Sequence, residues 1–163
     1  MHRLVLILTL LLPLSAYGKE SGPMIELRAR CLDGNPCPFT DEMIHVELEL
    51  FNAGEEPVLL PIDYYRRRGP KVILLDNHSG KESHIRMGPP NFALANSLQA
   101  LSPGEAVRIP WLVAPDSINR FALKPVDLTV RFSFNLTPML SAPDAVSVAT
   151  TLQVVEARSR PSE

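Results

Sequence analysis

The chain lacks a strong excess of charge of either sign. Its 163 residues include 16 Lys and Arg against 18 Asp and Glu, which gives a formal net charge of −2. Proteins that bind nucleic acid or an anionic membrane through their overall electrostatic field need a clear excess of basic over acidic residues. We therefore expect no nucleic-acid partner, and the charge balance gives no electrostatic case for an anionic membrane.

Sequence motifs of the common enzyme classes are absent as well. The chain contains no G-x-S-x-G, no H-E-x-x-H and no glycine-rich phosphate loop. The acidic residues Glu47 and Glu49 alternate on the polar side of one predicted strand, and Arg28 and Arg30 alternate on another. If these strands pair, the charges compensate one another. We expect a protein that is not an enzyme and that uses no cofactor.

Glycine is scarce relative to proline, with 8 Gly against 16 Pro. Proline removes a backbone donor and interrupts helices, whereas it is tolerated in turns and on edge strands. This composition disfavours a protein built from long helices. It favours short strands joined by turns.

Long apolar runs are also missing, apart from one near the N-terminus. Residues 4–12 are apolar except for Thr9, Arg3 precedes them, and Ala16-Tyr17-Gly18 places small residues at the −3 and −1 positions of a cleavage site. The run is shorter than the roughly 20 apolar residues that a membrane span needs. We predict that residues 1–18 are a signal peptide cleaved near Gly18, and that the mature chain is periplasmic or secreted, without a membrane span.

Cysteine occurs only twice, as Cys31 and Cys37. A metal site would need more ligands nearby, and a redox pair would favour C-x-x-C spacing. In an exported protein, two cysteines around a turn-forming Leu-Asp-Gly-Asn-Pro stretch are typically oxidised. We predict a disulfide that stabilises the fold by about 2–3 kcal/mol.

Alternation of apolar and polar residues predicts the strands of the mature chain. Residues 44–51 show it most clearly, and residues 126–134 carry the heaviest apolar face. Further strands are predicted at 25–30, 58–60, 71–75, 107–113 and 146–154. About seven short strands and no long helix favour an all-β fold, an immunoglobulin-like antiparallel β-sandwich. A small barrel is the alternative.

Local features refine this prediction. Residues 76–80 are typical of a hairpin tip, and residues 91–98 of a short helical turn. Pro110 indicates an edge strand or a bulge. We assign residues 19–156 to one domain and predict a disordered tail at 157–163.

Two segments resemble a known group of domains. Residues 48–58, Leu-Glu-Leu-Phe-Asn-Ala-Gly-Glu-Glu-Pro-Val, resemble the strand-and-turn signature of bacterial exported immunoglobulin-like domains, and residues 101–105 resemble their Pro-Gly turn. These domains include adhesion modules and BsuPI-type proteinase-inhibitor domains. The resemblance implies a sandwich in an exported bacterial protein. Residues 125–128, Pro-Val-Asp-Leu, depart from the Pro-Gly-x-Tyr pattern of many such domains.

The candidate binding residues form one run, Asp63 to Gly69. It contains Tyr64, Tyr65, Arg66, Arg67 and Arg68, and tyrosine and arginine are the residue types that dominate interface hot spots. An acidic protein patch or a polyanionic glycan would suit this run. The alternative is a solvated loop whose tyrosines fold onto the sandwich edge.

We therefore expect a binding module that presents loops to an envelope protein or an extracellular polymer, with residues 87–92 as a second candidate loop. Two alternatives stay open. One is a sandwich-type proteinase inhibitor that uses the loop from Leu32 to Phe39. The other is a periplasmic metal-handling protein that uses Asp76, His78 and His84.

Overall fold

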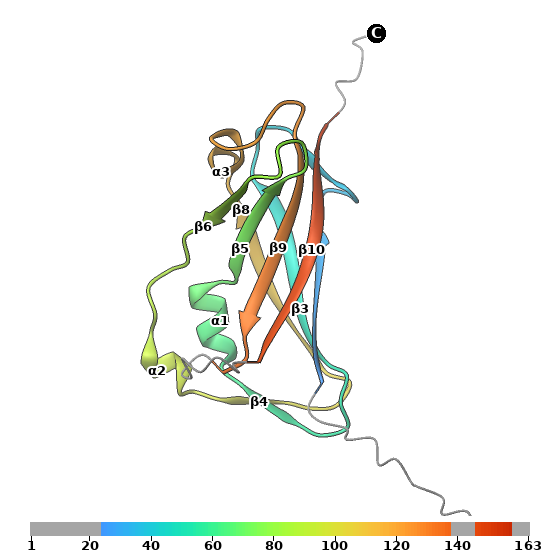
Figure 1. Cartoon of the computed structure of the whole chain (residues 1–163). Coiled ribbons are helices and arrows are strands. Elements are labelled where there is room, and N and C mark those ends of the chain that lie inside the picture. The colour runs from blue at the N-terminus through green and yellow to red at the C-terminus, as the bar shows by residue number, and fades with distance from the viewer. Residues whose placement is uncertain (1–23, 138–145, 158–163) are drawn as a thin grey trace, which may run out of the picture.

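The structure is a computed structural model that describes residues 24–137 and 146–157. The predicted signal peptide, the connection after residue 137 and all but the first residue of the predicted tail lie outside these ranges. The described residues form ten strands and three short helices (Figure 1). In chain order these are β1 (Ile25–Cys31), β2 (Cys37–Phe39), β3 (Ile44–Asn52), β4 (Val58–Leu60), α1 (Ile62–Arg68), β5 (Lys71–Asp76), β6 (Glu82–Ile85), α2 (Phe92–Ala95), β7 (Gln99–Leu101), β8 (Ala106–Val113), α3 (Pro115–Asn119), β9 (Asp127–Asn135) and β10 (Ser147–Glu156).

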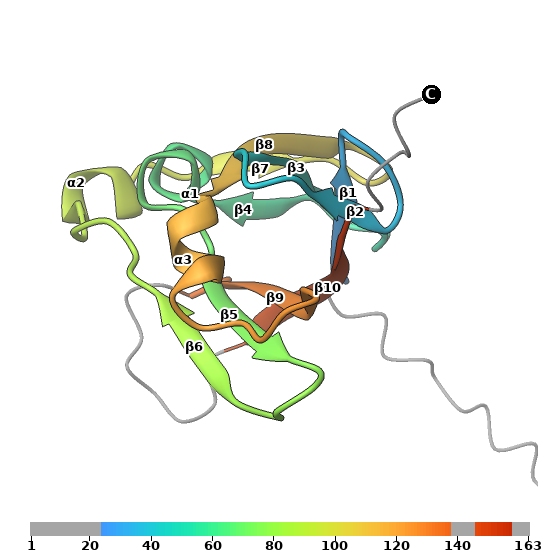
Figure 2. The ribbon, with the colours of Figure 1, turned by 90° about the horizontal axis from the view of Figure 1, so that it is seen from above.

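The strands form a two-layer β-sandwich, which confirms the predicted fold class. One layer is a three-stranded sheet of order β1-β3-β8, and the other is a five-stranded sheet of order β2-β10-β9-β5-β6. Figure 2 shows β3 and β8 in one layer and β5 and β9 in the other. The pairs are antiparallel, except that β2 runs parallel to β10. A ribbon of β4 and β7 lies at one end.

The alternation seen in the sequence produces the core. In β3, the side chains of Ile44, Val46, Leu48 and Leu50 are 0–2% exposed, while the intervening residues face outward. On β9, Leu128 and its inward-facing neighbours pack against them from the other layer. Removing this apolar surface from water is the main favourable contribution to folding, at about 25 cal/mol per Å².

The strand count exceeds the predicted number because three strands are too short to show alternation. These are β2, β6 and β7, of three or four residues each. The hairpin tip at residues 76–80 and the helical turn within 91–98 are confirmed. Pro110 lies on β8, an edge strand, as its missing N–H predicted. None of the helices in the described part of the chain is long and apolar enough to cross a membrane.

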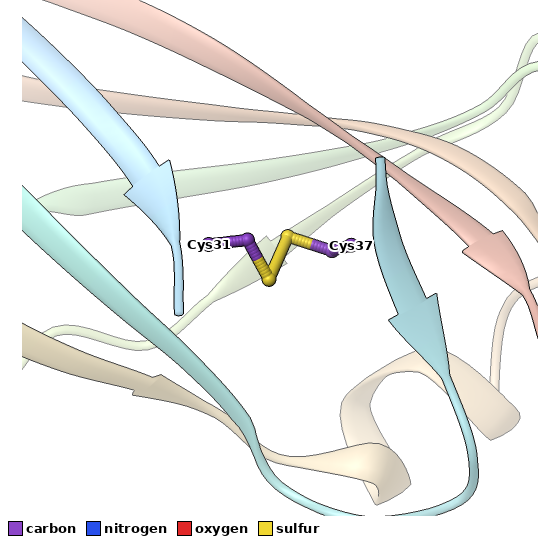
Figure 3. Close-up of a disulfide and its surroundings, with 2 residues drawn as sticks. All are labelled: Cys31 and Cys37. Carbon is purple, nitrogen blue, oxygen red and sulfur yellow. A yellow bond between two sulfur atoms is a disulfide. The ribbon is translucent and has the colours of Figure 1, made fainter. Parts of the chain in front are cut away.

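The predicted disulfide is present, and it connects the two sheets. Cys31 ends β1 in the three-stranded sheet, and Cys37 begins β2 in the five-stranded sheet, with their Cα atoms 5.6 Å apart (Figure 3). The bridge therefore holds the chain where it crosses from one layer to the other.

A buried amide attaches the β4–β7 ribbon to the sandwich. Asn52 is 0% exposed, and its Nδ2 donates to the carbonyls of Glu56 at 2.8 Å and Leu101 at 2.9 Å. Its Oδ1 accepts from the backbone N–H of Gly54 at 3.0 Å. One side chain thus satisfies three backbone groups at the end where α1 also lies.

Candidate functional site

The run from Tyr64 to Arg68 lies within helix α1, which begins at Ile62, so the expectation of a loop there was wrong. Asp63 in the first turn and the arginines in the last turn suit the dipole of a helix. Gly69 ends the helix at φ 79°, and its N–H donates to the carbonyl of Tyr65 at 2.9 Å. The helix lies at the end of the sandwich beside β5 (Figure 1).

The two tyrosines of α1 belong to the core. Tyr64 is 5% exposed and Tyr65 is 2% exposed. The Tyr65 ring packs 4.9 Å from that of Phe134, and its hydroxyl donates to the carbonyl of Asn135 at 3.0 Å. Burial raises the pKa of Tyr65 because it disfavours the charged phenolate. These rings hold α1 in place and present little surface to a partner.

Arg68 has an unusual environment for a cation. Its guanidinium donates to the hydroxyl of Tyr64 and lies 5.5 Å from the centre of that ring. Its Nε is buried and has no hydrogen-bond partner among the described residues. A buried N–H without a partner carries a desolvation cost, and because this Nε is shielded from the surface, it is not itself a site for a ligand.

A pocket of about 410 Å³ opens beside Arg68. Helix α1 supplies Tyr64, Tyr65 and Arg68 to its lining, so the structure brings three of the five predicted residues together. Strands β5, β9 and β10 supply polar side chains. These are Lys71, Ser133, Asn135 and Ser147.

Two basic residues, Arg68 and Lys71, line this pocket, and three more are close to its lining residues along the chain or on the same strand. Lys71 begins β5 opposite Ser133, and Arg131 lies two residues before Ser133 on the same face of the sheet. Arg86 immediately precedes Met87, which borders the pocket. We call the following five residues the α1 basic cluster: Arg67, Arg68, Lys71, Arg86 and Arg131. Within the described ranges none of them forms an ion pair, and Arg66, beside them, pairs with Asp63.

The arginines of the other sheet differ from this cluster. Arg28 bonds to Glu49 at 3.4 Å, Arg30 to Glu47 at 2.8 Å, and Arg108 lies within 3.6 Å of both glutamates. The predicted charge compensation between the first two strands is therefore confirmed. The outer face of the three-stranded sheet neutralises itself, whereas the α1 basic cluster forms no ion pair with the residues that the structure describes.

Two of the three residues proposed for metal binding, Asp76 and His78, have structural partners. Asp76 is 0% exposed and accepts from the hydroxyl of Ser79 at 2.6 Å and from the backbone N–H of His78 at 3.1 Å. The His78 ring contacts the carbonyl of Pro125 at 2.9 Å, and His84 is exposed on β6. Across residues 24–137 and 146–157, no three His, Cys, Asp or Glu side chains gather as a metal site.

The candidate inhibitory loop is shorter than the sequence indicated. Cys37 and Phe39 are 1% and 2% exposed because they belong to β2, so only residues 32–36 form an exposed loop. The second candidate, residues 87–92, is irregular up to the start of α2, as expected. It runs beside α1, where the N–H of Gly88 donates to the carbonyl of Arg68 at 3.3 Å.

Sequence reasoning missed the contribution of the sheet to this site. Lys71, Ser133 and Ser147 appear in the sequence as isolated polar residues near the ends of separate strands. Alternation places each on a polar face but does not indicate which strands are neighbours. Only the register, which pairs Lys71 with Ser133 and Asn135 with Ser147, brings them to one pocket.

No protein-family model matches the chain, and no curated protein matches it either. Among solved structures, one match is the X-ray structure of a target of the Northeast Structural Genomics Consortium. It has 11% sequence identity and a TM-score of 0.43, and the alignment covers 86% of this chain and 91% of that chain. These comparisons assign no family and no activity, and the resemblance to bacterial immunoglobulin-like domains stays a prediction.

Proposed function

We propose that this chain is an exported, non-enzymatic binding module of immunoglobulin-like type. It binds a negatively charged partner, an envelope protein or an extracellular polymer, at the α1 end of its sandwich. The observation that carries this proposal is the α1 basic cluster, two of whose members, Arg68 and Lys71, line a pocket. The whole chain has a net charge of −2, so this local concentration of unpaired cations does not follow from composition.

Electrostatics and rigidity both support this function. Unpaired surface cations attract an anionic partner and increase its association rate, whereas paired cations contribute little to such a field. The pocket is also held firmly, because the Tyr65 ring packs on Phe134 and its hydroxyl bonds to β9. Binding residues on a rigid framework lose little conformational entropy when a partner binds.

Two features support export. Residues 1–18 have the charge, apolar run and small residues of a signal peptide. The Cys31–Cys37 disulfide suits an oxidising compartment, where such bonds form and persist.

The test is affinity capture from an envelope fraction, with the mature chain from Lys19 onward as bait. The cluster variant is Arg67→Ala/Lys71→Ala, which removes two exposed side chains without touching the core. The matched control is Lys81→Ala/Arg120→Ala, which removes two other exposed cations outside the cluster. We expect a component that the parent and the control retain, that elutes with salt, and that the cluster variant loses. Equal capture by all three baits, or capture by none, would contradict the proposal.

A further inference from the structure

The pocket beside α1 combines two kinds of polar group. Arg68 and Lys71 are cations, while Ser133, Asn135 and Ser147 are neutral. The cross-strand pairs Lys71 with Ser133 and Asn135 with Ser147 place the sheet residues on one face. The pocket volume of about 410 Å³ lies within the range of small-molecule sites.

The cationic side is suited to a carboxylate. The Arg68 guanidinium is oriented by its bond to the Tyr64 hydroxyl, and Arg68 belongs to the lining of the pocket. The planar donors of arginine match the two oxygens of a carboxylate, and Lys71 adds a second charge at the same pocket. No acidic side chain from the described part of the chain lines this pocket.

The neutral side is suited to hydroxyl groups. Serine hydroxyls donate and accept hydrogen bonds, which matches the dual character of sugar hydroxyls. The Asn135 amide adds N–H donors, while its Oδ1 already accepts from the backbone N–H of Thr137 at 2.9 Å. A simple aliphatic acid would leave these groups unused. Stacking of a base or an aromatic side chain is not favoured, because Tyr64 and Tyr65 are 5% and 2% exposed.

Beyond the pocket, the remaining cations indicate a ligand with repeated charge. Arg67, Arg86 and Arg131 are exposed and form no ion pair with the described residues. A ligand that carries one carboxylate would engage only Arg68 and Lys71. A chain of acidic sugars would engage the pocket with one unit and the surrounding cluster with the next.

We infer that the pocket binds one unit of a carboxylate-bearing polysaccharide, with the other three residues of the α1 basic cluster, Arg67, Arg86 and Arg131, along the path of the adjacent units. The inference rests on the proposed function, because it names the class of the extracellular partner. It is narrower than the proposed function, since an acidic protein partner would satisfy the proposed function but would overturn this inference.

The experiment is calorimetric titration of the mature, disulfide-bonded chain with trigalacturonate. The matched ligand is the methyl-esterified trisaccharide, which keeps every ring hydroxyl and loses the charges. We expect the acid to bind at least tenfold more tightly than its ester, with an affinity that falls as salt is added. Equal binding of the two sugars would overturn the role of the cations.

Variants locate the site. Lys71→Gln and Arg68→Gln are each expected to weaken binding at least tenfold, while Arg120→Gln leaves it unchanged. Lys71 is exposed, so its variant keeps the test valid if Arg68→Gln fails to fold. Ser147→Ala, also at an exposed residue, is expected to weaken the sugar and to leave binding of a tri-glutamate peptide unaffected. Undiminished sugar binding by both the Lys71 and Ser147 variants would overturn the placement.

Two further outcomes separate the inference from the proposed function. If tri-glutamate binds as tightly as trigalacturonate and competes with it, the sugar assignment fails while a negatively charged partner remains supported. If no sugar binds, but an envelope protein is captured by the parent and lost in the Arg67→Ala/Lys71→Ala variant, only the inference fails. If neither assay detects a ligand, both fail.

Discussion

Substitution of Gly69 by alanine is expected to destabilise the fold severely. Gly69 has φ 79° and ψ 175°, a backbone conformation that side chains with a Cβ rarely adopt and that costs roughly 1–3 kcal/mol. A Cβ at this residue would also fall on the indole ring of Trp111, and forced overpacking of this kind costs typically about 1–3 kcal/mol. Together these effects predict a loss of about 2–6 kcal/mol, a large share of the 5–15 kcal/mol typical of a domain.

The assay for Gly69→Ala is equilibrium unfolding in urea with the disulfide intact. The control is Gly80→Ala in the hairpin tip, where φ is also positive at 69° but no atom beyond the two adjacent residues lies within 4 Å of the place that a Cβ would occupy. We expect Gly80→Ala to lose only the backbone cost, about 1–2 kcal/mol. Equal losses for the two variants would refute the argument that contact with Trp111 requires glycine at residue 69.

Three further predictions concern single features of the fold. Asn52→Ala leaves the carbonyls of Glu56 and Leu101 without their donor and is expected to lower the unfolding free energy in urea by about 2–4 kcal/mol. The control Asn91→Ala, at an exposed residue, should lower it by at most about 1 kcal/mol. The double change Cys31→Ala/Cys37→Ala opens a short loop and is expected to lose about 2 kcal/mol; an unchanged unfolding midpoint after reduction of the parent would contradict this. The hydrogen bond from Ser79, with those from the backbone of His78 and Leu123, holds the pKa of Asp76 below its usual value. Ionised Asp76 therefore stabilises the fold above its unfolded pKa of about 3.9, and this contribution is lost as pH falls through the lower folded value. Asp76→Asn should reduce the loss of unfolding free energy as pH falls below about 5. An unchanged pH dependence in this range would show that Asp76 does not contribute.

The fold class was predictable because burial in a sandwich leaves a direct trace in the sequence. Each long strand buries alternate residues, so β1, β3, β8, β9 and β10 all appeared as period-two patterns. Short strands leave no such trace. The segment Cys37–Phe39 was taken for loop because three residues cannot establish a period.

Helix α1 shows a different limit of sequence reasoning. Its seven residues span two turns, too few for an amphipathic pattern to be distinguished from a strand or a loop. The run was singled out for its tyrosines and arginines, and three of the five side chains do line the pocket. Their roles differ from the expected ones, because burial makes Tyr64 and Tyr65 supports of the site.

The sequence by itself determined the strands with clear alternation, the pairing of its two cysteines and the candidate run on α1. These are local properties. Alternation along the chain decides which face of a strand a residue occupies, and a short separation in sequence keeps the two thiols close together. Only the tertiary structure decided which cations are neutralised and which are not. Arg28 faces Glu49 across two paired strands. Lys71 instead lies opposite Ser133 and shares with Arg68 a pocket that no carboxylate from the described residues lines. The strand order and register decide such encounters, because they bring together residues from distant parts of the chain that no local pattern connects.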